Sequence, residues 1–134
     1  MTALTKIEGI GPVNAQKLNR AGIRSVEALL AKGADTNMRR EIAETTGISH
    51  DLILEWVNHA DLFRINGVGE EYSDLLEASG VDTVPELAQR NPDNLYSKMV
   101  AVNEEKKLVR KLPTQEQVSD WVAQAKKLPR VIKY

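Results

Sequence analysis

The stretch Ile7-Glu8-Gly9-Ile10-Gly11 decides the fold, because it returns fifty-eight positions later as Ile65-Asn66-Gly67-Val68-Gly69. The match continues beyond the glycines, where Ala21-Gly22-Ile23 corresponds to Ser79-Gly80-Val81. A fixed offset held over about twenty-three positions indicates a duplicated structural unit. We expect each copy to form a short helix, a tight Gly-x-Gly turn and a second helix.

The rest of the chain carries the start and stop signals of helices. Ser25 is a good N-cap for a helix over 26–32, and Thr36 or Asn37 can begin another that runs to about Thr46. Thr114 and Gln117 form a capping-box pattern ahead of a helix with apolar residues at helical spacing. No segment shows sustained alternation of apolar and polar residues. The sequence therefore predicts an all-α fold of about ten short helices.

Two further turns have a weaker form of the same pattern. Gly47-Ile48-Ser49 resembles a worn Gly-x-Gly turn, and Leu112-Pro113-Thr114 occupies the corresponding place in the second half. The sequence predicts two similar lobes, 1–61 and 62–134, and one intact and one degenerate turn in each lobe is an arrangement that this spacing allows. The β-branched pair Val131-Ile132 favours an extended segment after the last helix.

Composition limits the class of protein. A hydrophobic fraction of 42% and a charged fraction of 28% are typical of a globular chain. No apolar run reaches the ~18–20 residues that span a bilayer, and the first residues lack an apolar stretch of signal-peptide length. We therefore expect no membrane association. The absence of cysteine excludes disulfides and thiolate metal sites, and it fits a cytoplasmic location.

Charge is distributed unevenly along the chain. Residues 1–61 carry seven basic and eight acidic groups, residues 62–97 carry two and seven, and residues 98–134 carry nine and four. The balances are −1, −5 and +5, which sum to the net charge of −1. A neutral total argues against a dedicated nucleic-acid binder, whereas a basic end can still attract polyanions.

The glycine turns carry a resemblance to a known motif. Leu4-x-x-Ile7-x-Gly9-Ile10-Gly11-x-x-x-Ala15-x-x-Leu18 resembles the helix–hairpin–helix consensus, and the stretch from Leu62 to Leu76 matches it as closely. The whole chain is similar to a bacterial family of tandem helix–hairpin–helix proteins with no established function. Members are often labelled DNA-binding or flap-nuclease-like by fold analogy. The resemblance implies tandem helix–hairpin–helix lobes.

The chemistry of an intact turn is that of an anion site. Glycines allow a turn tight enough to expose consecutive N–H groups at the positive end of a helix. A nucleic-acid phosphate bound there is held without regard to base sequence. The candidate nucleic-acid-binding residues are Gly9, Ile10, Gly11, Asn14, Lys17 and Arg20, together with the basic residues Lys106, Lys107, Arg110 and Lys111. The alternative is that the glycines only permit a close helix crossing, and that the basic run is a solvated surface or a face that pairs with the acidic stretch 70–93.

The second intact turn, Gly67-Val68-Gly69, is followed directly by Glu70-Glu71. These carboxylates would repel an approaching phosphate, so we expect this turn to be structural. Trp56 and Trp121 lie on apolar helix faces, where we expect them in the core and not as stacking platforms for bases.

No catalytic group of residues emerges. His50 and His59 have no acidic partner at helical spacing to both, so no metal site is expected. The carboxylate cluster of a two-metal nuclease and a phosphate-binding P-loop are both missing. We therefore predict no enzyme, no cofactor and no small-molecule substrate. The predicted partner is a DNA or RNA backbone, and the alternative is a protein partner in a scaffold that has lost phosphate binding.

Overall fold

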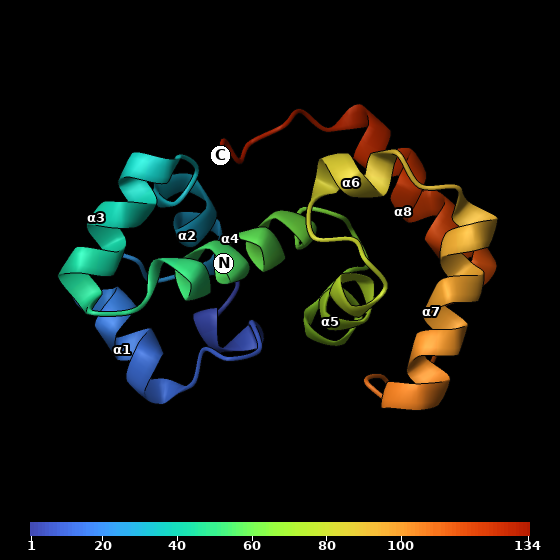
Figure 1. Cartoon of the computed structure of the whole chain (residues 1–134), viewed down its shortest axis with the longest axis horizontal. Coiled ribbons are helices and arrows are strands. Elements are labelled where there is room, and N and C mark those ends of the chain that lie inside the picture. Colours follow the sequence, from blue (N-terminus) through green and yellow to red (C-terminus); the bar gives the residue numbers. More distant parts are fainter. The chain divides into compact units, whose positions relative to one another are not determined.

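The computed structural model describes residues 1–134 and contains only helices and their connections (Figure 1). The elements are the 3-10 helix η1 (Leu4–Lys6) and the α-helices α1 (Pro12–Arg20), α2 (Val26–Lys32), α3 (Thr36–Thr46), α4 (His50–Leu62), α5 (Glu70–Ala78), α6 (Val84–Ala88), α7 (Pro92–Lys106) and α8 (Gln115–Lys127). The predicted all-α class is confirmed. The expectation of about ten helices was slightly too high, because no separate short helix precedes the second Gly-x-Gly turn, where α4 ends at Leu62.

The chain forms two compact units. Unit 1 consists of Met1–Asp61 together with Val131–Tyr134, and unit 2 consists of Leu62–Arg130. In unit 1, α1 packs against α3 and η1; in unit 2, α8 packs against α6 and α7, and α5 packs against α7. The segment Val131–Tyr134 is without helix, as expected, but it lies with unit 1 although the predicted second lobe ran to residue 134.

Side-chain caps explain where several helices begin. The Ser25 hydroxyl accepts a hydrogen bond from the Ala28 N–H (3.0 Å), and Thr114 and Gln117 complete a capping box at α8. The cap of α3 is Asp35, whose carboxylate accepts from the Met38 N–H (2.8 Å), and not the predicted Thr36 or Asn37. An acidic side chain at this place also interacts favourably with the positive end of the helix.

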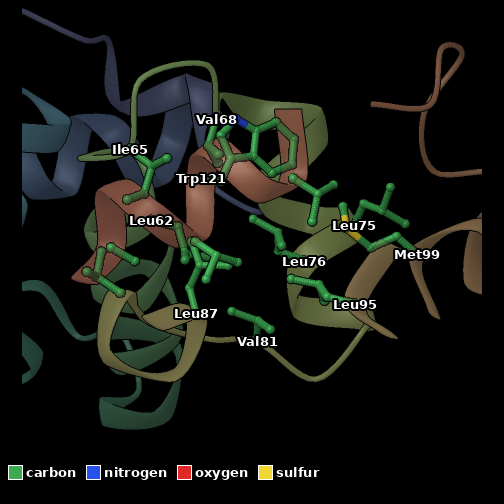
Figure 2. Close-up of a cluster of buried hydrophobic side chains, with 14 of the residues drawn as sticks. Leu62, Ile65, Val68, Leu75, Leu76, Val81, Leu87, Leu95, Met99 and Trp121 are labelled. Carbon is green, nitrogen blue, oxygen red and sulfur yellow. The ribbon is translucent and has the colours of Figure 1, made fainter. Parts of the chain in front are cut away.

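Each unit has its own apolar core. The largest fully buried side chains of unit 1 include Ile7, Leu18, Ile23, Leu29, Ile53 and Trp56. The core of unit 2 draws on every helix from α5 to α8 (Figure 2), with Leu75 and Leu76 from α5, Leu87 from α6, Leu95 and Met99 from α7, and Trp121 from α8. Burial of these side chains supplies the main favourable free energy of folding.

The two tryptophans pack against the first glycines of the Gly-x-Gly turns. Trp56 and Trp121 are each 1% exposed, which confirms that both belong to the core. A Cβ atom added to Gly9 would lie 3.1 Å from Nε1 of Trp56, and one added to Gly67 would lie 3.0 Å from Nε1 of Trp121. Both glycines are left-handed, with φ of +93° and +97°. Each turn therefore needs glycine at its first position for two independent steric reasons.

Candidate nucleic-acid interface

The first Gly-x-Gly turn leaves the start of α1 uncovered. Ile10 is buried in the core, which holds the turn in place, while Gly11 is exposed and takes the N-cap position with an extended backbone (φ −85°). Nothing lies within 4 Å of a Cβ atom added to Gly11. The space beside Gly11 is therefore open, whereas the space beside Gly9 is filled by Trp56.

Two backbone donors at this end of α1 lie ahead of its first intrahelical hydrogen bond. The first intrahelical hydrogen bond runs from the Ala15 N–H to the Gly11 carbonyl (2.9 Å), and Pro12 has no N–H. The N–H groups of Val13 and Asn14 precede that bond, and no side chain caps the helix. Adjacent unsatisfied donors at the positive end of a helix form an anion site.

The predicted basic residues of the first turn lie on the exposed face of α1. Lys17 and Arg20 are exposed and follow Val13 at i+4 and i+7, so the three residues form one stripe along the helix. Lys17 stands one helical turn from Val13 on the same face of α1. Both cations also stand in the last turn of α1, where they interact favourably with its negative end.

The side chain of Asn14 contacts the backbone of the first turn. Its side-chain amide donates a hydrogen bond to the Gly9 carbonyl (3.4 Å), which braces the turn. The side chain of Asn14 therefore contributes to the shape of the turn.

The two degenerate turns close their helix ends with hydroxyl groups. The Ser49 hydroxyl accepts from the Leu52 N–H (3.2 Å) at the start of α4, and the Thr114 hydroxyl accepts from the Gln117 N–H (3.1 Å) at the start of α8. These residues stand where the sequence alignment places the second glycine of an intact turn. At α4 and α8 the N–H group three residues after the cap is bonded to a hydroxyl group, whereas the corresponding N–H group of α1, that of Asn14, has no side-chain partner.

The second intact turn has the same backbone arrangement as the first, but the helix that follows it begins with acidic residues. Val68 is buried, Gly69 is the uncapped N-cap of α5, and nothing lies within 4 Å of a Cβ atom added to Gly69. The first turn of α5 is acidic, with Glu70 and Glu71 both exposed. An anion approaching this helix end meets two carboxylates.

The predicted basic segment lies in unit 2, where Lys106 ends α7 and the other three cations stand in the ordered loop that follows. Its cations, Lys106, Lys107, Arg110 and Lys111, are all exposed. The Asn103 side chain holds the loop through two hydrogen bonds with the backbone of Val109, accepting from its N–H (2.9 Å) and donating to its carbonyl (3.2 Å). The loop therefore presents its charges from a fixed backbone.

A tyrosine joins this loop to the second turn. The Tyr72 hydroxyl donates to the Lys111 carbonyl (3.0 Å), and its ring lies 5.2 Å from that of Trp121. The basic loop and the second Gly-x-Gly turn are thus neighbours within unit 2. The sequence grouped the loop with Gly9–Arg20, which lie in unit 1, and it gave no sign of the roles of Asn103 and Tyr72.

Comparison with known proteins identifies the family. The family model described as "Domain of unknown function (DUF4332)" matches residues 8–128. The chain belongs to this family. No curated protein and no solved structure matches the sequence. None of the helices combines the length and the apolar character that crossing a bilayer requires.

Proposed function

We propose that this protein is a non-catalytic module that binds the backbone of DNA or RNA through the open end of α1. The observation that carries the proposal is the pair of uncapped N–H groups at Val13 and Asn14, next to the cationic stripe of Lys17 and Arg20. In the same proposal, the two Gly-x-Gly turns are helix–hairpin–helix motifs of a tandem protein, and its location is cytoplasmic.

The chemistry of the site favours a phosphate. Two adjacent N–H groups at a helix N-terminus can share the oxygens of one phosphate, and the helix dipole adds to the attraction. Lys17 and Arg20 then neutralise the same or the next phosphate along the strand. Backbone contacts of this kind carry no base information, so binding is independent of sequence.

Unit 2 has a different part in this proposal. Glu70 and Glu71 oppose phosphate at the second turn, which therefore serves the fold. The basic segment with Lys106, Lys107, Arg110 and Lys111 provides a separate cationic surface that can contact a phosphate backbone without a helix end.

Fluorescence anisotropy with labelled duplex and single-stranded DNA and with RNA tests the proposal. With about two phosphates neutralised at α1, the logarithm of the binding constant should fall against the logarithm of the salt concentration with a slope of about −2. Two duplexes of equal length and different sequence should bind with equal affinity. No binding at low salt would refute the proposal.

Matched variants assign binding to α1. Lys17→Glu should weaken binding about tenfold or more, while Arg40→Glu makes the same change of charge at an exposed position on α3 and should have a much smaller effect. Gly11→Ser should weaken binding without loss of stability, because a serine at the N-cap would occupy the donors. Equal effects of Lys17→Glu and Arg40→Glu would assign binding to overall charge and not to this site.

One observation favours the alternative of a protein partner. Val13, at the mouth of the open helix end, is 67% exposed. An apolar side chain there gives nothing to a phosphate and could pack against another protein. A failure of all nucleic acids to bind at low salt would favour this second candidate.

A further inference from the structure

The segment Val131–Tyr134 is held on unit 1 by specific contacts. The Lys133 N–H donates to the Ala34 carbonyl (2.7 Å), as in a strand pair, and Ile132 is 3% exposed. The Tyr134 hydroxyl donates to the side-chain carbonyl of Asn58 (3.2 Å). These contacts use both the backbone and the side chains of a short extended peptide.

Arg39 is the centre of this docking site. Its side chain is 1% exposed, and its guanidinium donates to the carbonyls of Gly33 and Lys133 (2.8 Å each) and to the hydroxyl of Thr36 (3.1 Å). The guanidinium carbon lies 5.9 Å from the centre of the Tyr134 ring. A buried cation needs acceptors, and one of the three that Arg39 has belongs to the docked segment.

The chain leaves unit 2 immediately before this segment. Arg64 donates to the Pro129 carbonyl (2.8 Å) and fixes the end of unit 2, whereas Lys133 is fixed on unit 1. Arg130, which is exposed, lies between the two anchored points. The docked segment therefore follows unit 2 directly in the chain and packs within unit 1.

We propose that the docked segment is a releasable clamp, which is held at the Arg39 site within unit 1 and can open while the rest of unit 1 stays folded. The contact consists of one buried aliphatic side chain and a few hydrogen bonds, so its opening is a local event that requires far less than global unfolding. Arg39 favours the closed state, because opening removes one of its acceptors without exposing it fully to water. Burial lowers the pKa of Arg39, and Tyr134 and Asp35 act against that shift, which agrees with a cation held inside this site.

Hydrogen exchange of the full chain, followed by NMR, tests the clamp at the Lys133 amide. The variant is Ile132→Asn, because asparagine removes the apolar anchor without offering Arg39 a new carboxylate. The control is Lys133→Ala, since Lys133 uses only its backbone in the contact and its side chain is exposed. Exchange at residue 133 should be at least tenfold faster in Ile132→Asn and unchanged in Lys133→Ala. The core amides of Leu29 and Ile53 should keep their protection.

The rate of tryptic cleavage after Arg130 is a second measure of opening, because a protease binds the flanking segment only when that segment is extended and undocked. Cleavage should be at least tenfold faster in Ile132→Asn than in the parent and the control. Equal rates of exchange and cleavage in all three proteins would overturn the proposal, since the segment would not be held by Ile132. Loss of protection at Leu29 and Ile53 together with residue 133 would also overturn it, because the segment would then be an integral part of the unit 1 fold.

Discussion

The two glycines of the first turn should respond very differently to the same small substitution. Gly9→Ala places a Cβ atom on a residue with φ of +93° and 3.1 Å from Nε1 of the buried Trp56. Gly11→Ala places the same atom where φ is −85° and nothing lies within 4 Å. Each variant adds one methyl group, and the two positions are only two residues apart. Each variant is therefore the control for the other.

The magnitudes follow from these environments. A left-handed conformation costs an L-residue about 1–2 kcal/mol, and crowding a closely packed indole adds about 1–3 kcal/mol. We therefore expect Gly9→Ala to lower the free energy of unfolding by about 2–4 kcal/mol. At Gly11 the backbone is relaxed and the space is open, so the loss should stay below about 1 kcal/mol, the difference between glycine and alanine at an N-cap.

Urea unfolding followed by tryptophan fluorescence and by circular dichroism measures both variants. Because Trp56 and Trp121 report on different units, a variant in unit 1 can produce two separate transitions. Gly67→Ala, where φ is +97° and Nε1 of Trp121 lies 3.0 Å from the added atom, should repeat the effect in unit 2. Equal stability of Gly9→Ala and Gly11→Ala would refute the packing of tryptophan on the first glycine.

Three further outcomes are expected. Thr114→Ala should lower the free energy of unfolding by about 1 kcal/mol in thermal or urea melts, because it removes the cap of α8, whereas Ser119→Ala on the exposed face of that helix should change little. Hydrogen bonds from the Thr2 N–H lower the pKa of Glu27, so the stability they contribute is present above the unfolded-state pKa and is lost as acid protonates the folded carboxylate. Urea melts of Glu27→Gln should therefore show less loss of stability than the parent on acidification below about pH 4. Both tryptophans, being buried, should emit at short wavelength and resist quenching by iodide, and strong quenching would contradict their placement in the core.

The parts of the fold that depend on local chemistry could be predicted from the sequence. The left-handed Gly9 and Gly67 and the caps Ser25 and Thr114 follow from residue types within a few positions of one another. The cap of α3 was placed one or two residues late, because Asp35 stands beside two other residues able to cap a helix. Such errors are typical at helix ends, where adjacent polar residues compete for the same role.

The contacts that join distant segments could not be predicted in this way. The bond from Tyr72 to Lys111 spans 39 positions, and that from Arg39 to Lys133 spans 94. In the sequence Arg39 stands beside Arg40, and this pattern is typical of exposed charges on a polar helix. Its burial depends on where Val131–Tyr134 docks, which no local pattern encodes. The charge balance along the chain allowed a pairing of the basic run with the acidic 70–93 stretch, and the bond from Tyr72 to Lys111 brings the basic loop close to the helix that follows the second turn.

The difference between the two glycines of a turn bears directly on function. Packing against tryptophan and a left-handed backbone account for Gly9 by the fold alone. Neither reason applies to Gly11, and Ser49 and Thr114 show that this fold accepts a side chain at the N-cap and uses it to close the helix. A hydroxyl there would stabilise α1 by a few tenths of a kcal/mol, so stability alone favours a residue other than glycine. Gly69 is open in the same way although Glu70 and Glu71 follow it, so the open end of α1 supports the proposed anion site only together with the exposed cations Lys17 and Arg20.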